Sequence, residues 1–326
     1  MKVFITRKIP NRGIDMLKNK GWEVLISPHD RVLTREELIE MGKGADAVLS
    51  QLTDKIDGSI VDGWDPSTSS GRTVKIIANY AVGYDNFNVK EISERNILMT
   101  NTPEVLTETV AEHTFALMLA IAHRIAEADK FSRAGMYKGW EPELLLGTDL
   151  SHKVLGVIGL GRIGSRVAHH AVKGFDMRVI YYDVKRNEQF EKEFGASFRD
   201  NPDNVFKEAD FISIHVPLLP STHHLVNFER LKLMKSSAYI INTSRGPIID
   251  EAALKDALKS GVIKGAAIDV WEKEPELTLG LADLGNIIIT PHIASATEET
   301  RQKMGEVAAK NIIEALEGRT PPNLIK

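Results

Sequence analysis

Three side chains suited to one reaction follow strand-like segments in the second half of the chain: Arg245, Glu274 and His292. Reduction of a 2-oxo acid requires a hydride at the carbonyl carbon and a proton at the carbonyl oxygen. A histidine can donate and recover that proton near neutral pH, and a neighbouring carboxylate orients the ring and favours the imidazolium. A guanidinium can bind the substrate carboxylate through two hydrogen bonds and polarise the carbonyl. The three residue types therefore match the oxidation and reduction of 2-hydroxy acids.

Each of these residues, taken alone, also has an ordinary structural explanation. An arginine after a strand is usually a surface charge, and a histidine such as His292 is usually a satisfied capping residue. The dinucleotide motif described below favours the catalytic interpretation, and ligands of open α/β sheets bind outside the carboxyl ends of the strands. We therefore expect all three at that edge of one sheet.

The elements that position them form an alternating series. Short β-branched runs alternate with helical patterns, which is typical of parallel α/β sheets. The first predicted strands cover residues 3–6, 22–27, 47–52 and 75–79. The second series covers residues 154–159, 178–183, 211–217, 238–244, 265–271 and 286–290. Helices are predicted at 107–128 and 297–316, a polar loop at 65–71, and an irregular apolar arm, indicating a partner surface, at 135–150.

A glycine motif of the GxGxxG type follows the strand predicted at 154–159. It comprises Gly159, Leu160, Gly161, Arg162, Ile163 and Gly164, and a helical pattern follows it, as a dinucleotide site requires. Gly159 permits the tight turn, Gly161 lets the backbone approach a pyrophosphate, and Gly164 allows close helix–strand packing. The ordinary alternative is a bare strand–turn–helix unit, in which Arg162 would face only solvent.

An acidic residue ends the next predicted strand, about twenty residues after the motif, where such sites place one. That residue is Asp183. Its carboxylate would accept hydrogen bonds from the ribose hydroxyls and repel a 2′-phosphate, which favours NAD(H) over NADP(H). Lys185 and Arg186 follow directly and keep NADP(H) open as the alternative.

Composition excludes several other classes of protein. A length of 326 residues implies more than one domain, and 43% hydrophobic with 26% charged residues is ordinary for a globular protein. The absence of cysteine excludes disulfides and thiolate chemistry and fits a cytoplasmic protein. A net charge of −4 gives no basic excess for nucleic acid, and no apolar run is long enough to span a membrane. The adjacent pairs His169–His170 and His223–His224 would point about 100° apart on a helix, so we expect no metal site.

Several stretches together resemble the D-isomer-specific 2-hydroxyacid dehydrogenases, over essentially the whole chain. The matching stretches are the glycine motif and residues 79–85, 100–103, 215–218, 242–246, 265–275 and 290–293. Residues 79–85, the arm around Trp140 and residues 292–297 are most similar to the glyoxylate/hydroxypyruvate reductase branch.

The resemblance implies an α/β protein with two Rossmann-like, doubly wound domains. A nucleotide-binding domain at 102–292, with a dimerisation arm at about 105–150, would be inserted into a discontinuous, flavodoxin-like substrate domain at 1–101 and 293–326.

The resemblance also implies roles for individual residues. Arg245 would anchor the substrate, His292 would be the acid–base group paired with Glu274, and the backbone N–H groups of Val82 and Gly83 would hold the substrate carboxylate. Further expected substrate contacts are Leu52, Ser295 and Trp140. Further expected cofactor contacts are Val110, Val184, Lys185, Val216, Pro217, Thr243, Ser244, Asp269 and Ala294. Trp140 would either reach the pocket of a neighbouring subunit or pack within the arm.

We therefore expect a homodimeric, NAD(H)-dependent reductase of glyoxylate or hydroxypyruvate, with no membrane, nucleic acid or metal partner. Many glyoxylate reductases of this type carry a small polar residue at the position of Asp183 and prefer NADPH, so this chain departs from them. The alternatives are another D-2-hydroxyacid dehydrogenase, acting on D-lactate, D-glycerate or 3-phosphoglycerate, and an NAD-sensing binding protein similar to the family's corepressors.

Overall fold

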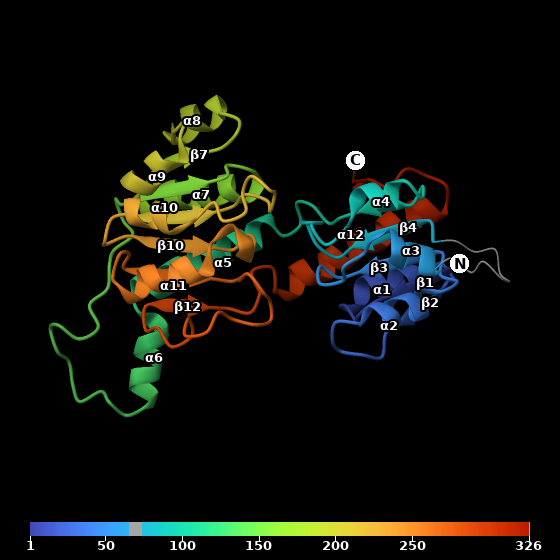
Figure 1. Cartoon of the computed structure of the whole chain (residues 1–326), viewed down its shortest axis with the longest axis horizontal. Helices are drawn as coiled ribbons and strands as arrows, with labels where there is room; N and C mark the ends of the chain where they lie inside the picture. Colours follow the sequence, from blue (N-terminus) through green and yellow to red (C-terminus); the bar gives the residue numbers. More distant parts are fainter. Residues whose placement is uncertain (65–73, 326) are drawn as a thin grey trace. The chain divides into compact units, whose positions relative to one another are not determined.

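The computed structural model describes residues 1–64 and 74–325, which form two compact units (Figure 1). The first unit consists of Met1–Leu106 and Ala296–Lys326, and the second consists of Thr107–Ser295. The first unit is therefore built from both ends of the chain. The boundaries expected after residues 101 and 292 lie slightly earlier than these, and the polar loop expected at 65–71 lies outside the described residues.

A five-stranded parallel sheet forms the centre of the first unit, in the order β2-β1-β3-β4-β5. Its strands are β1 (Lys2–Ile5), β2 (Glu23–Ile26), β3 (Ala47–Ser50), β4 (Ile76–Asn79) and β5 (Leu98–Thr100). Its helices are α1 (Asn11–Lys18), α2 (Arg35–Gly42), α3 (Gly58–Trp64), α4 (Val89–Ser93) and α12 (Glu298–Leu316). The order 2-1-3-4-5 is that of flavodoxin-like folds, so this part of the predicted fold class is confirmed.

The closing helix α12 packs against α1 and against strands β3 and β4. Its N-cap is Thr297, whose side chain accepts a hydrogen bond from the N–H of Thr300. A Cβ added at Gly13 of α1 would lie 2.4 Å from the carbonyl oxygen of Gly305 on α12. Glycine at position 13 therefore permits the close contact that joins the two ends of the chain.

A seven-stranded parallel sheet forms the centre of the second unit, in the order β12-β11-β10-β9-β6-β7-β8. Its strands are β6 (Val154–Ile158), β7 (Arg178–Tyr182), β8 (Ser197–Phe198), β9 (Phe211–Ile214), β10 (Tyr239–Asn242), β11 (Gly265–Ile268) and β12 (Ile287–Ile289). Counted from β6, the order contains the 3-2-1-4-5-6 arrangement of dinucleotide-binding Rossmann folds. The predicted doubly wound sheet is confirmed.

Helices lie on both faces of this sheet (Figure 1). They are α5 (Thr107–Ala122), α7 (Arg162–Phe175), α8 (Glu188–Phe194), α9 (Pro202–Glu208), α10 (Phe228–Leu233) and α11 (Glu251–Lys259), with a 3₁₀ turn η1 (Gly246–Ile248) after β10. Strands β6, β9, β10 and β11 have no exposed residue, as expected for parallel strands covered on both faces.

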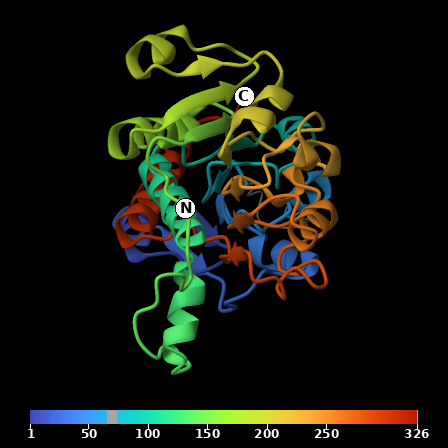
Figure 2. The same cartoon turned by 90° about the vertical axis from the view of Figure 1, so that its left-hand side faces the viewer.

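The single helix expected at 107–128 is instead two helices, α5 and α6 (Ile125–Arg133). They are separated because Arg124 has a φ of 55°, in the left-handed region, which ends the regular helix. Helix α5 buries much of its surface, whereas α6 buries no residue. Helix α6 and the coil after it extend away from the sheet of their unit (Figure 2).

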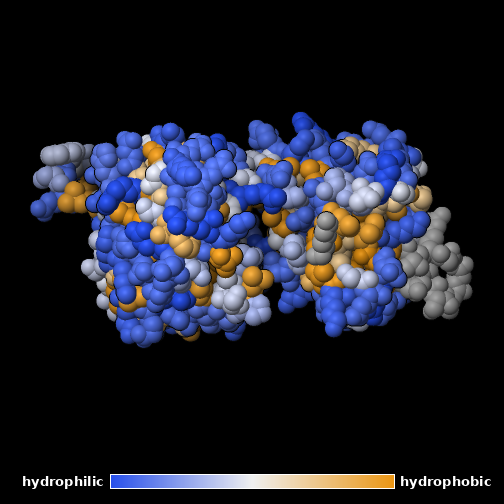
Figure 3. All heavy atoms as spheres, turned by 90° about the horizontal axis from the view of Figure 1, so that it is seen from above, coloured by the Kyte–Doolittle hydropathy of each residue, from blue (hydrophilic) through white to orange (hydrophobic). Residues whose placement is uncertain are grey.

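The coil at 134–153 lies wholly within the described residues and contains no helix or strand, as expected for the arm. It exposes large apolar side chains to solvent, among them Trp140, which is 82% exposed, and Leu146, which is 62% exposed. Elsewhere, hydrophilic residues cover most of the face shown in Figure 3, with apolar patches between them. Within the described ranges, the chain has no helix with the length and apolar character needed to cross a membrane.

Candidate active site

His292 and Glu274 form a hydrogen-bonded pair in the second unit. Nδ1 of His292 lies 2.9 Å from Oε2 of Glu274, and the two side chains are 24% and 28% exposed. The N–H of Trp271 donates to the other carboxylate oxygen, Oε1, at 3.2 Å. Because Nδ1 is engaged with the carboxylate, Nε2 is the ring nitrogen positioned to exchange a proton with a bound substrate.

The segment that carries His292 is fixed by the fully buried carboxylate of Asp269, directly after β11. Oδ1 accepts from the hydroxyl of Thr290 at 2.6 Å and from the N–H of Ile293 at 2.9 Å. Oδ2 accepts from the N–H of Ala294 at 2.7 Å, and the Asp269 carbonyl accepts from the N–H of His292 at 2.8 Å. These bonds hold His292 at a φ of 53°, a left-handed conformation that costs energy in a residue with a side chain.

Asp269 stays ionised despite its burial. Burial alone raises its pKa, but hydrogen bonds from His113, Thr290 and the Ile293 and Ala294 N–H groups outweigh this and hold the pKa below its ordinary value. Nε2 of His113, on α5, lies 3.5 Å from Oδ1 of Asp269. The observed contacts of Asp269 are all with other residues of the chain. Its expected contact with a nicotinamide stays a prediction.

Arg245 follows β10, in a turn shaped by Asn242, the last residue of that strand. The Asn242 side chain donates to the carbonyl of Arg245 at 2.9 Å and accepts from the N–H and hydroxyl of Ser244 at 3.0 and 2.7 Å. A Cβ added at Gly246 would lie 1.9 Å from the backbone of Trp271. Only glycine therefore lets the Arg245 turn pack this closely on the segment that carries Glu274.

Sequence patterns did not single out Asn242 as a site residue. A polar residue ending the apolar strand β10, and buried to 1% exposure, is the signal that could have found it.

The glycine motif has the geometry that a pyrophosphate needs. Gly159 has a φ of 95°, and a Cβ at Gly164 would lie 2.0 Å from the Gly159 carbonyl oxygen. A Cβ at Gly161, by contrast, would meet nothing within 4 Å, so the backbone there is open to an approaching ligand. Helix α7 starts after Gly161 without a side-chain cap and without an acidic residue in its first turn. Its first N–H groups therefore favour an anion, and the residues present fit a dinucleotide.

Asp183 lies beside this motif at the end of β7. Its carboxylate accepts from the N–H of Leu160 at 2.7 Å and from the N–H of Lys185 at 3.1 Å. The guanidinium of Arg186 is paired with the carboxylate of Glu191 through two hydrogen bonds of 2.7 and 2.9 Å. Arg186 is thus turned toward α8, which weakens the argument for a 2′-phosphate. Val184 and Lys185 are exposed.

Other expected cofactor contacts lie around the ends of β9 and β10. Oγ1 of Thr243 lies 3.0 Å from Oγ1 of Thr114 on α5, and Thr114 also donates to the carbonyl of Val110 at 2.7 Å. A Cβ at Gly159 would lie 2.9 Å from Cγ1 of Val216, so the glycine turn packs against the end of β9. Thr114 thus links Val110 to Thr243, and Val216 lies against the glycine turn. Pro217 follows Val216 and is exposed, Ile163 is half-buried, and Arg162 is exposed at the start of α7.

His215, which directly follows β9, was expected to serve packing. Its Nε2 lies 2.7 Å from the hydroxyl of Ser213, and burial lowers its pKa to about 3. A histidine that stays neutral near pH 7 does not share the acid–base role assigned to His292.

Expected substrate residues in the first unit are held by a network of asparagines. Asn101 donates to the carbonyl of Val82 at 2.7 Å, and the buried Asn79 donates to the carbonyl of Gly83 at 2.9 Å. Asn79 also donates to Asn86, whose amide donates to the carbonyls of Gln51 at 3.2 Å and Asp54 at 3.0 Å. The network fixes the Val82–Gly83 loop against the segment that contains the half-buried Leu52. Their contacts with substrate stay a prediction, as do those of Ser295 and Trp140.

Residues 115–294 match the family model described as D-isomer specific 2-hydroxyacid dehydrogenase, NAD binding domain. The match covers more than half of the chain and coincides with the Rossmann unit. The chain belongs to the D-isomer-specific 2-hydroxyacid dehydrogenase family. This confirms the predicted resemblance and the predicted enzyme class, an NAD(P)-dependent 2-hydroxyacid dehydrogenase.

Several known proteins resemble the chain over its full length. It is 44% identical to a glyoxylate reductase of Pyrococcus furiosus, with 99% of this chain and 95% of that protein covered. The crystal structure of the TT0316 protein of Thermus thermophilus has a TM-score of 0.91 at 40% identity, with 100% of both chains covered. An NADPH-dependent glyoxylate/hydroxypyruvate reductase of Sinorhizobium meliloti, solved with NADP and malonate, has a TM-score of 0.84 at 27% identity, with 99% and 96% covered.

Proposed function

We propose that the protein reduces glyoxylate and hydroxypyruvate to glycolate and D-glycerate with NADH. The observation that carries this proposal is the 2.9 Å pair of His292 and Glu274, held by the same close-packed strand ends that present Arg245. The identity of 44% to a glyoxylate reductase supports the choice of substrate.

The residues of the chain then have separate tasks. A bound nicotinamide supplies the hydride for the 2-oxo carbon. The Arg245 guanidinium binds the substrate carboxylate and polarises the carbonyl. His292 donates the proton on Nε2 to the carbonyl oxygen, and the Glu274 carboxylate stabilises its imidazolium and fixes its ring. In the oxidative direction His292 takes the proton back.

Other parts of the site belong to the same proposal. The peptides of Val82 and Gly83 would offer N–H donors to the substrate carboxylate, which is supported by the asparagines that fix their carbonyls. Leu52 and Ser295 would line the substrate pocket. The first unit would thus be the substrate domain and the second the nucleotide domain.

NADH is the proposed reductant. The support is the Asp183 carboxylate beside the glycine motif, together with the pairing of Arg186 to Glu191. NADPH is the alternative, because the reductase of Sinorhizobium meliloti is NADPH-dependent.

The protein is also proposed to be a cytoplasmic homodimer. The exposed apolar residues of the arm, Trp140 and Leu146, support the dimer. The absence of cysteine, which suits a reducing compartment, supports the cytoplasmic location.

A substrate panel tests the proposal. The purified protein is assayed with NADH and with NADPH against glyoxylate, hydroxypyruvate, pyruvate and phosphohydroxypyruvate. We expect the highest kcat/KM for glyoxylate or hydroxypyruvate with NADH. Pyruvate as the best substrate would instead indicate a D-lactate dehydrogenase, and no turnover with any of them would indicate a binding protein.

The variant His292→Asn tests the mechanism. We expect it to lose about 10²–10⁴-fold in kcat, because it lacks the proton donor. NADH binding, followed by nicotinamide fluorescence, should be unchanged, because His292 is not part of the glycine motif. Unchanged turnover would overturn the assignment of His292.

A further inference from the structure

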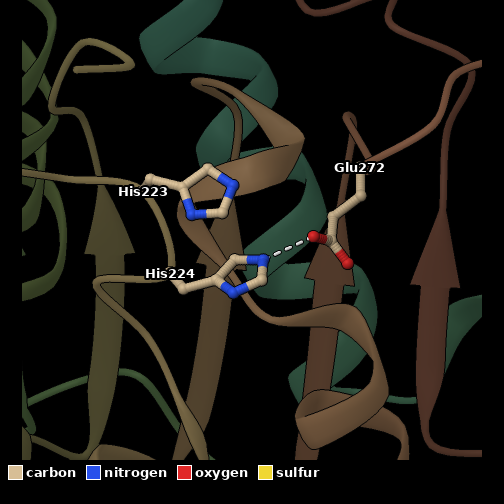
Figure 4. A group of neighbouring side chains, drawn as sticks. All are labelled: His223, His224 and Glu272. Atoms are coloured by element: carbon tan, nitrogen blue, oxygen red, sulfur yellow. Dashed lines mark hydrogen bonds and ion pairs between the residues drawn. The ribbon is translucent and has the colours of Figure 1, made fainter. Parts of the chain in front are cut away.

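A cluster of potential metal ligands lies in the second unit, outside the catalytic set: His223, His224 and Glu272 (Figure 4). One ligand atom from each residue lies within 4.8 Å of the other two. Nε2 of His224 is 2.5 Å from Oε1 of Glu272, and Figure 4 shows these two side chains pointing toward each other, with the ring of His223 beside that of His224. The reaction proposed above uses none of the three.

The two histidines are brought together by their backbone. Sequence reasoning placed such a pair on a helix, where neighbouring side chains diverge, and that premise is wrong here because both residues lie in a turn. His224 has a φ of 50°, and its N–H donates to the carbonyl of Pro247 at 2.8 Å. The rings consequently stack, with centroids 4.0 Å apart and planes inclined by 28°. A left-handed residue with a side chain is costly, so the turn is held in place by its surroundings.

The carboxylate of Glu272 is also held. Its Oε2 accepts from the N–H of Glu251 at 3.2 Å, which leaves Oε1 toward His224. The Glu251 side chain is 3% exposed, and its Oε1 has no hydrogen-bond partner within the described part of the chain. Two carboxyl groups thus lie close together at this position, and one of them is buried.

The donor set selects the kind of cation. Two imidazoles and one carboxylate are the ligands of zinc sites that keep a fourth position open. Imidazole also suits nickel and copper, whereas magnesium and calcium prefer oxygen ligands. Zinc bonds of about 2.0–2.2 Å in a tetrahedron separate the ligand atoms by roughly 3.3 Å. The His224–Glu272 pair would therefore open by about 1 Å, which side-chain rotation at a partly exposed site permits.

A second group of the same residue types provides a contrast within the chain. His170 Nε2 lies 2.6 Å from Oε1 of Glu108, and His169 directly precedes His170. Here, however, the guanidinium of Arg166 pairs with Glu108 and lies 3.2 Å from Nδ1 of His169. The positive charge of Arg166 already neutralises the Glu108 carboxylate, so we expect this second group not to bind a metal ion.

We propose that His223, His224 and Glu272 bind one divalent transition-metal ion, with Zn²⁺ as the best fit. The ion would tie the turn at 222–225 to the segment after β11. Because Glu272 precedes Glu274 by two residues, that segment is the one that carries the partner of His292. Metal binding is independent of the proposed function, since it is measured without substrate or nucleotide.

Calorimetric titration of the metal-free protein with ZnCl₂ tests the proposal. We expect one saturable site, a rise in Tm with bound Zn²⁺, weaker binding at pH 5.5 than at pH 7.5 because ligands must lose protons, and no response to MgCl₂. Glu272→Gln and His224→Ala should each weaken Zn²⁺ binding by at least about 10-fold, a loss typical even of groups outside the coordination sphere. His170→Ala is the matched control and should bind Zn²⁺ as the wild type does.

A variant at the exposed residue His223 distinguishes a loss of metal binding from a loss of folding. His223→Ala should keep the wild-type Tm without metal and still lose Zn²⁺ affinity. The proposal is overturned if the wild type shows no saturable binding, or if the variants at 223, 224 and 272 bind Zn²⁺ as tightly as His170→Ala does.

Discussion

The carboxylate of Glu274 gives the His292 ring both a hydrogen bond and a negative charge, at 2.9 Å. Glu274→Gln keeps an acceptor and removes the charge, so the imidazolium is less favoured. Because the imidazolium is the proton donor in reduction, we expect the variant to lose about 10-fold in kcat for reduction.

Steady-state kinetics at one pH measure this loss. The control is Glu276→Gln, which removes an exposed charge from the same segment and should leave kcat unchanged. If Glu274→Gln keeps the wild-type kcat, the carboxylate does not support the proton donor.

His215 makes a separate prediction about stability. Burial lowers its pKa from the ordinary 6.5 to about 3. Between these two pH values the histidine is therefore protonated in the unfolded chain and neutral in the folded chain. Stability is therefore lost as pH falls below about 6.5, and between pH 7 and pH 5 this group alone should remove about 2 kcal/mol of the free energy of unfolding. His215→Gln should lose about that much less stability over the same interval, as measured by urea unfolding at both pH values. Equal losses in the two proteins would show that folding does not lower the pKa of His215.

At the scale of elements, the close contact at Gly246 positions the turn after β10. Gly246→Ala would place a Cβ 1.9 Å from the Trp271 backbone, so the turn with Arg245 must shift. We expect kcat/KM to fall by about 10²-fold, as a displacement of about 1 Å near a reacting group can cause. Steady-state kinetics measure the loss.

Gly174→Ala is the matched control for that variant. Gly174 lies inside α7, where a Cβ would meet nothing within 4 Å. The substitution should leave kcat/KM unchanged and add about 0.5–1 kcal/mol of stability. A Gly246→Ala enzyme with wild-type kinetics would show that the turn can give way without moving Arg245.

Much of the element pattern was predictable because parallel strands covered on both faces are continuous apolar runs, as in β6 and β9. The short strands β5 and β8 were not predicted, since two or three residues leave no periodic pattern. The break at Arg124 was missed because the apolar pattern of the first helix continues past it.

The candidate site shows the same division. The glycine motif, Asp183 and the three catalytic residues could be found because their types and spacing carry the chemistry. Asn79, Asn86 and Asn242 could not, because they act through hydrogen bonds to backbone groups that only the fold brings near. The helical geometry assumed for the His223–His224 pair was wrong because a left-handed φ is not visible in the sequence.

At the scale of the whole molecule, the arm predicts how copies assemble. Trp140 and Leu146 expose large apolar surfaces on a segment that extends from its unit. If the arm forms the dimer, the double variant Trp140→Glu with Leu146→Glu should halve the mass in sedimentation experiments. The variant Leu279→Glu alters a side chain that is 91% exposed outside the arm and should keep the wild-type mass. A wild-type monomer, or a dimer that survives the arm variant, would refute this role.

The close packing of α1 on α12 bears on how the protein is made. When a ribosome has completed β1 to β5, the helix that covers part of β3 and β4 is still unsynthesised, and residues 107–297 must be translated first. At about 5–20 residues per second this takes about 10–40 s. Throughout that interval the part of β3 and β4 that α12 later covers stays exposed. We expect chaperones to bind this exposed apolar surface. The second unit is encoded by one uninterrupted stretch, so it can finish folding on the ribosome while the unit begun first is still waiting for its last helix.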